Sequence, residues 1–265
     1  MRMIVILSVV AMFGLSSAAM AEVVTESVEY MDGEQKLIGY LAYDDAEQGV
    51  RPCVLILHQG KSLGDYEKQR ARMLAEMGYV AFALDIYGEG NMPADYGAAG
   101  KIATHYKTHR DQLRHRANLG LTRLKAHPLV DGQRTAAIGY CFGGTAVLEL
   151  ARSGADVRGV VSFHGGLDSP NPEDGANITA SVLVHHGADD PTVSAEAIAA
   201  FQQEMRAHKV DWRMVYHGGA VHSFTEKEAD LRNNPTVVAY DKHADERSWA
   251  SMRLFFDELF NGDDQ

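Results

Sequence analysis

The segment Gly139-Tyr-Cys-Phe-Gly-Gly144 restricts the fold of this chain more than any other. It follows a short apolar run that ends at Ile138, and it precedes Thr145–Arg152, whose pattern is typical of a helix. The pattern G-x-C-x-G between a strand and a helix is that of a nucleophile elbow, with cysteine in place of serine. Such a turn strains the backbone of its central residue and needs small neighbours. We therefore predict a reactive thiol at Cys141, with the Phe142 N–H facing the place where an oxyanion forms.

Strand-like apolar runs alternate with segments of helical periodicity from residue 53 onward. This alternation predicts one α/β domain with a mainly parallel central sheet and helices on both faces. The segment from Val23 to Tyr43 alternates around Asp32-Gly33, which predicts an N-terminal β-hairpin. Strands are expected over 53–57, 78–84, 134–138, 157–163, 182–186 and 211–216, and helices over 65–77, 108–127, 145–152, 194–208 and 244–260. The stretch 85–100 is expected to be an irregular loop near a substrate entrance.

The N-terminus has the features of a targeting segment. Arg2 precedes an apolar run from Met3 to Leu15, and Ala19-Met20-Ala21 follows as a cleavage site. These features predict a secretory signal peptide at residues 1–21, cut after Ala21, that leaves 22–265 as the folded domain. We expect an exported protein, periplasmic in a bacterium, without membrane insertion after cleavage. The net charge of −11 argues against nucleic acid as a partner.

A cysteine nucleophile needs a histidine base, and the histidine needs an acid that orients it. In an open parallel sheet these groups are expected on loops at the carboxyl ends of strands. Asp189 and Asp190 follow one predicted strand, and His222 follows the next. The order nucleophile, acid, histidine is that of the α/β-hydrolases. Either aspartate alone is typical of a turn before a helix, but the three groups together predict a catalytic triad.

With these motifs the chain resembles the dienelactone hydrolase family of α/β-hydrolases, from about residue 53 to residue 260. The resemblance rests on Gly139-Tyr-Cys-Phe-Gly-Gly144, Gly187-x-x-Asp190-x-x-Val193, His222-Ser-Phe224 and Asp85-Ile-Tyr-Gly88.

The resemblance implies a hydrolase of a small ester, lactone or thioester that uses no cofactor and no metal. It assigns Cys141 as the nucleophile, His222 as the base and Asp190 as the acid. The backbone N–H groups of Gly60 and Phe142 are then the two oxyanion donors.

Two positions depart from the family pattern. Gln59 stands where the family usually carries an acid, and Glu226 stands four residues after His222, where an arginine is expected. An acidic residue there repels an anionic substrate, which argues against dienelactone itself. Without an anion at position 59, Cys141 is expected to ionise more readily than in relatives.

Other residues are expected to line the site or to lie away from it. Gln59, Tyr87 and His164 are expected to line the substrate site, with Tyr96 near the entrance. Cys53 is expected to be a buried, inert thiol. The basic run Lys101 to Arg116 is interpreted as one solvated helix face.

Two alternative functions stay open. Histidines and aspartates are plentiful at predicted strand ends, and they suggest a zinc hydrolase, although neither H-E-x-x-H nor paired C-x-x-C spacing occurs. The second alternative is a binding or redox-sensing protein on the same fold that uses a reactive Cys141. The sequence does not specify an oligomeric state.

Overall fold

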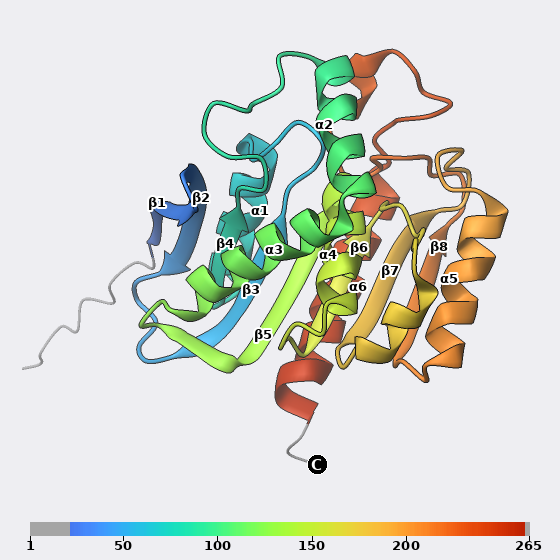
Figure 1. Cartoon of the computed structure of the whole chain (residues 1–265). Helices are drawn as coiled ribbons and strands as arrows, with labels where there is room; N and C mark the ends of the chain where they lie inside the picture. The colour runs from blue at the N-terminus through green and yellow to red at the C-terminus, as the bar shows by residue number, and fades with distance from the viewer. Residues whose placement is uncertain (1–21, 263–265) are drawn as a thin grey trace, which may run out of the picture.

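The computed structural model describes residues 22–262, and eight strands within that range form one sheet in the order β1-β2-β4-β3-β5-β6-β7-β8 (Figure 1). The strands are β1 (Val23–Asp32), β2 (Gln35–Asp44), β3 (Arg51–Leu57), β4 (Val80–Leu84), β5 (Val130–Tyr140), β6 (Gly159–Phe163), β7 (Ser181–Gly187) and β8 (Trp212–His217). β2 is antiparallel to β1 and β4, and the remaining neighbours are parallel. The expected mainly parallel sheet and N-terminal hairpin are confirmed. The signal peptide expected at 1–21 lies outside the described residues.

Helices cover both faces of the sheet, as predicted. They are α1 (Asp65–Ala75), α2 (Tyr96–Thr108), α3 (Arg110–Lys125), α4 (Phe142–Arg152), α5 (Ala195–Ala207) and α6 (Lys242–Asn261), with short 3₁₀ turns η1 (Pro172–Asn177) and η2 (Ala229–Arg232). Figure 1 shows α3, α4 and α5 on one face and α1 and α6 on the other. Side chains of β3 alternate between the two cores: Leu55 and Leu57 join one, and Val54 and Ile56 join the other. Burial on both faces explains why the strand is continuously apolar.

The helix predicted over 108–127 begins at Arg110 in the structure, and a separate helix precedes it. The helical backbone is interrupted at His109, where φ is −119° and ψ is 67°, and this residue caps the end of α2 and the start of α3. Asp95 accepts a hydrogen bond from Ala98 N at 2.7 Å and so begins α2 inside the expected irregular stretch. Neither proline nor glycine marks the break, so helical periodicity alone could not locate it. The break lets α2 lie over the carboxyl ends of the strands (Figure 1).

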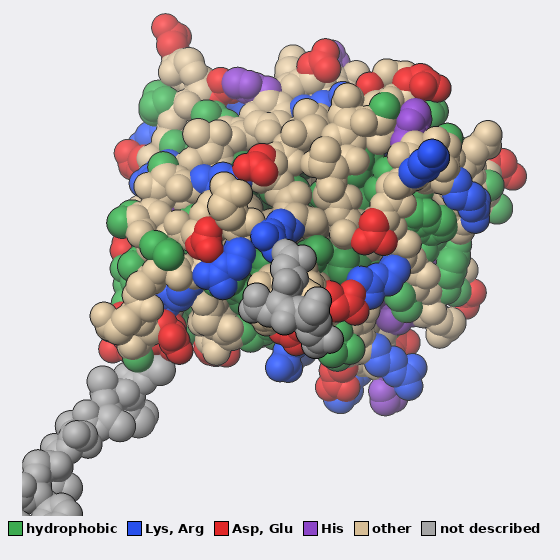
Figure 2. All heavy atoms as spheres, turned by 90° about the horizontal axis from the view of Figure 1, so that it is seen from below, with side chains coloured by type: hydrophobic (Ala, Val, Ile, Leu, Met, Phe, Trp, Pro, Cys, Tyr) green, Lys and Arg blue, Asp and Glu red, His purple; other side chains and the backbone are tan. Residues whose placement is uncertain are grey.

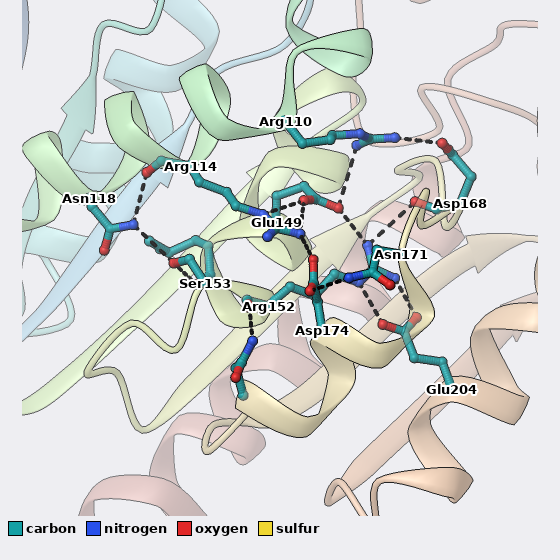
Figure 3. A network of polar contacts seen from close by, with 12 residues as sticks. Arg110, Arg114, Asn118, Glu149, Arg152, Ser153, Asp168, Asn171, Asp174 and Glu204 are labelled. Carbon is teal, nitrogen blue, oxygen red and sulfur yellow. Dashed lines mark hydrogen bonds and ion pairs between the residues drawn. The ribbon is translucent and has the colours of Figure 1, made fainter.

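The basic run is not one solvated helix face, because Arg110 is buried and Arg114 is half-buried, each in ion pairs (Figure 3). Glu149 of α4 lies 3.6 Å from Arg110, 2.8 Å from Arg114 and 2.9 Å from Arg152. Arg152 also contacts Glu204 of α5 at 2.7 Å, and both partners of that pair are buried. This network joins α3, α4 and α5. It therefore fixes α4, the helix that begins at the elbow.

The end of the molecule opposite α2 carries intermixed acidic and basic side chains (Figure 2). At the amino ends of β5 and β6, Arg134 contacts Asp131 at 2.7 Å and Lys125 contacts Asp156 at 2.7 Å. No helix among residues 22–262 combines the length and the apolar character needed to cross a membrane. The loops that carry the predicted site residues lie at the other end, beneath α2.

Candidate active site

Cys141 occupies a sharp turn between β5 and α4. Its φ of 55° and ψ of −113° place it in a region that non-glycine residues rarely adopt. A Cβ at Gly139 would lie 1.9 Å from Gly143 O, and one at Gly143 would lie 2.0 Å from Leu57 O, so both positions require glycine. The Cys141 N–H donates to Phe163 O at 3.0 Å. The elbow expected from the sequence is therefore present.

Three side chains from the loops after β5, β7 and β8 meet at this turn. His222 Nε2 lies 3.0 Å from Cys141 Sγ, and His222 Nδ1 donates to Asp190 Oδ2 at 2.8 Å. Asp190 Oδ1 accepts from Thr192 N at 2.8 Å and from Thr192 Oγ1 at 2.6 Å, which fixes the carboxylate. Asp190 is buried, whereas Asp189 is exposed. The structure thus brings Asp190, and not its neighbour, to the imidazole.

The electrostatics favour a charged pair. Burial by itself raises the pKa of Cys141, but the charge and hydrogen bond of His222, the charge of Lys107 and the Phe142 N–H together lower it to about 7. Burial by itself lowers the pKa of His222, but the Cys141 sulfur and the Asp190 carboxylate raise it to about 10. Between these values the site holds a thiolate beside an imidazolium.

A cavity of about 180 Å³ opens onto the sulfur. The small residues of α2 form its roof, and its remaining wall comes from the loops after β3 and His222. Its lining residues are Gln59, Gly60, Lys61, Tyr96, Ala99, Gly100, Ala103, Lys107, Cys141, Phe142 and Arg232. Among these described residues Lys61, Lys107 and Arg232 carry positive charge and none is an aspartate or glutamate, so the cavity attracts anions.

Glu226 does not present its charge to this cavity. It is buried, it accepts a hydrogen bond from Gln59 Nε2 at 3.2 Å, and it forms an ion pair with Arg232. The Arg232 guanidinium lies over the Tyr96 ring, 4.7 Å from its centroid, and lines the cavity. The charged group that faces the cavity is therefore an arginine, ten residues after His222 instead of four.

Gln59 lines the cavity, but the other two expected substrate-lining residues lie outside its wall. Tyr87 is buried, and its hydroxyl donates to Gly60 O at 3.1 Å. His164 is buried beneath the elbow, where its Nδ1 accepts from Cys141 N at 3.1 Å. Both side chains support the backbone of site residues. A position at a strand end does not reveal whether a side chain points into the cavity or under it.

Sequence reasoning missed Lys107 and Arg232 as members of the cavity wall. Lys107 lies on α2, which was not predicted, and Arg232 lies in the short 3₁₀ turn η2. His58, one of the strand-end histidines that suggested a metal site, directly follows β3 and is fully buried. A histidine at the end of a parallel strand was the only available signal for that residue.

The second cysteine lies far from this chemistry. Cys53 is buried in β3, burial raises its pKa to about 11, and its sulfur contacts Thr135 Oγ1 at 3.3 Å. Both cysteines are free. Within residues 22–262, no cluster of three or more His, Cys, Asp or Glu side chains is placed to hold a metal ion.

A mainly parallel sheet, a strained strand-to-helix turn after β5 and loops at the carboxyl ends of β7 and β8 that meet this turn define an α/β-hydrolase fold. Residues 37–260 match the sequence profile of the dienelactone hydrolase family, and the chain belongs to that family. It is thus a hydrolase of esters or lactones.

Known relatives align over most of the chain. A Bradyrhizobium protein named "Probable 2-oxo-3-(5-oxofuran-2-ylidene)propanoate lactonase" is 29% identical over 234 residues, which cover 84% of this chain and 90% of that protein. A solved structure named m3DLH is 41% identical with a TM-score of 0.87, and the match covers 90% of this chain and 99% of that one. A dienelactone hydrolase-like promiscuous phosphotriesterase from metagenomic libraries is 42% identical with a TM-score of 0.85, covering 89% and 98%.

Proposed function

We propose that this protein hydrolyses a small ester or lactone with Cys141 as nucleophile, His222 as base and Asp190 as the acid that orients the imidazole. One observation supports the proposal above the others: sulfur, imidazole and carboxylate form a continuous chain of contacts at 3.0 and 2.8 Å. The strained elbow holds the sulfur at the floor of the cavity. A histidine within reach of a thiol and fixed by a buried carboxylate is the arrangement that nucleophilic catalysis requires.

In the first half-reaction the thiolate attacks the carbonyl carbon, the S–C bond forms, and the carbonyl electrons move to oxygen. The Phe142 and Gly60 N–H groups are proposed to stabilise that oxyanion, with each such donor typically worth about 3 kcal/mol. Both residues line the cavity beside Cys141. Collapse of the intermediate expels the alkoxide, which takes the proton of the His222 imidazolium.

In the second half-reaction neutral His222 takes a proton from water, and the resulting hydroxide attacks the thioester. The second tetrahedral intermediate collapses, the S–C bond breaks, and the carboxylic acid product leaves the thiolate behind. His222 keeps the proton that it took from water, so the resting ion pair of thiolate and imidazolium is restored. A thiolate leaves readily, so a tetrahedral intermediate formed from an amide expels the sulfur in preference to the amine. We therefore expect esters to react and peptides not to react.

The cavity favours a small anionic substrate. Lys61, Lys107 and Arg232 line about 180 Å³ of space, and opposite charges strengthen association. Glu226 was expected to repel an anionic lactone, but its carboxylate is paired with Arg232. The lactonase named among the relatives fits the same substrate class.

Phosphotriester hydrolysis is a second candidate activity. It is favoured by the 42% identity to the promiscuous phosphotriesterase over 89% of this chain. Thiolate attack on phosphorus would use the same oxyanion donors.

We also propose that residues 1–21 direct export, as their charged start, apolar run and cleavage site suggest.

The test compares turnover of p-nitrophenyl acetate, a small lactone and a p-nitrophenyl dialkyl phosphate by the wild type, Cys141→Ala and Cys53→Ala. We expect Cys141→Ala to lose turnover while keeping its fold by circular dichroism, and Cys53→Ala to keep turnover. Unchanged ester hydrolysis in Cys141→Ala would refute the assignment. No turnover by the wild type, together with stoichiometric oxidation of Cys141 by peroxide, would favour the redox-sensing alternative.

A further inference from the structure

We propose that His58 and Tyr87 are positioning residues that hold the Gly60 peptide with its N–H directed at the oxyanion. This inference rests on the proposed function, because an oxyanion forms only if Cys141 attacks a carbonyl or phosphoryl group. Neither side chain lines the cavity, so neither contacts the substrate. Their role is exerted through the backbone that they bind.

His58 makes two hydrogen bonds that fix its tautomer. Its Nε2 lies 3.2 Å from the backbone N of Ile86, and its Nδ1 lies 2.7 Å from Gln59 O. A backbone N–H can only donate, so Nε2 carries the lone pair. Nδ1 therefore carries the proton and donates it to Gln59 O. Burial lowers the pKa of His58, which keeps this neutral tautomer in place.

The bond to Gln59 O determines where the next N–H points. The carbonyl of Gln59 and the N–H of Gly60 belong to one peptide group, and in a trans peptide they point in opposite directions. His58 and the Ser62 N–H, at 3.2 Å, both hold that carbonyl on the side away from the cavity. The Gly60 N–H then points to the opposite side, toward the cavity that Gly60 lines.

Tyr87 fixes the other side of the same residue. Its hydroxyl donates to Gly60 O at 3.1 Å, and its ring lies edge-on to His58 with centroids 4.7 Å apart. The Gln59 N–H is held by Glu67 Oε1 at 3.0 Å. Side chains therefore hold the peptide groups on both sides of the Gly60 N–H. A donor that is held before the reaction begins needs no reorganisation when negative charge develops.

Two substitutions separate positioning from packing. In His58→Asn the amide nitrogen can occupy the place of Nδ1 and keep the bond to Gln59 O. In His58→Gln the amide reaches the place of Nε2 and keeps only the contact with Ile86. We expect His58→Gln to lower kcat for a p-nitrophenyl ester roughly 10- to 100-fold with little change in KM, because a misdirected donor loses part of the 10²- to 10³-fold effect of a whole donor. His58→Asn is expected to recover most of that loss.

Alkylation of Cys141 by iodoacetamide needs no oxyanion donor, so its rate should stay at the wild-type value in both variants. Equal loss of kcat in both variants, in step with a loss of thermal stability, would overturn the proposal. If His58→Gln does not fold, Tyr87→Phe provides the test: we expect a several-fold lower kcat, and an unchanged kcat overturns the proposal. Failure of the proposed function looks different, because Cys141→Ala would then keep its activity.

Discussion

Nε2 of His222 lies 3.0 Å from the sulfur of Cys141, close enough for each group to stabilise the charge of the other. The pKa of the thiol falls to about 7 and that of the imidazole rises to about 10 because each ion favours its partner. The two groups titrate as a pair. The Gln59 amide does not contact the sulfur through a hydrogen bond but donates to Glu226 Oε1 at 3.2 Å.

The alkylation rate of Cys141 should therefore rise as pH passes about 7, because only the thiolate reacts. The measurement is the initial rate of iodoacetamide labelling at Cys141 in Cys53→Ala between pH 5 and 10, followed by mass spectrometry. His222→Ala should move the midpoint upward, since burial remains while the positive charge is lost. A wild-type thiol that stays inert until above about 8.5, the value of a free thiol, would contradict the ion pair.

The choice between the two adjacent aspartates makes a second prediction. Asp190→Asn should lower kcat roughly 10²- to 10⁴-fold, because the amide no longer stabilises the imidazolium and favours the wrong tautomer. Asp189→Asn is the matched control: its side chain is exposed, so its kcat should stay within a factor of two of the wild type. Steady-state kinetics on one ester decides the matter. Comparable losses in both variants would show that the acid is not Asp190 alone.

Sequence patterns predicted the parallel sheet, the hairpin and the elbow well, because each depends on local spacing. The G-x-C-x-G pattern has a steric cause: Cβ atoms at Gly139 and Gly143 would collide with backbone. The break at His109 was missed because no glycine or proline marks it, and α2 was missed because Gly97 and Gly100 within it favoured an irregular loop. The partners of charged side chains could not be predicted either. Nothing in the sequence around Glu226 indicates that its carboxylate forms an ion pair with Arg232 and does not face open solvent.

The buried network beneath α4 makes a third prediction, on stability. Arg152→Met would leave Glu149 and Glu204 buried with less positive charge, and breaking a buried pair typically costs about 3–5 kcal/mol. Arg213→Met removes an exposed ion pair with Glu258 and should change the free energy of unfolding by less than about 1 kcal/mol. Urea unfolding of both variants measures the difference. Equal effects of the two substitutions would mean that the network does not support the fold.

Arg232 makes the last prediction, on substrate charge. It lines the cavity and forms an ion pair with Glu226, which lies outside the cavity wall. Arg232 is therefore placed to attract a substrate carboxylate. The informative substrates are the mono-p-nitrophenyl ester of succinate and p-nitrophenyl butyrate, which have acyl chains of equal length and differ in charge. Arg232→Gln should raise KM for the succinate ester by about tenfold, equivalent to ~1.4 kcal/mol, and change KM for the butyrate ester little.

The same substitution leaves Glu226 without its partner, and its charge then adds repulsion to the lost attraction. The double variant Glu226→Gln with Arg232→Gln separates these two effects, because it removes both charges. We expect its KM for the succinate ester to lie between those of the wild type and Arg232→Gln, since Lys61 and Lys107 remain in the wall. If KM rises equally for both esters in Arg232→Gln, the arginine shapes the cavity but does not recognise charge, and the anionic substrate class is wrong.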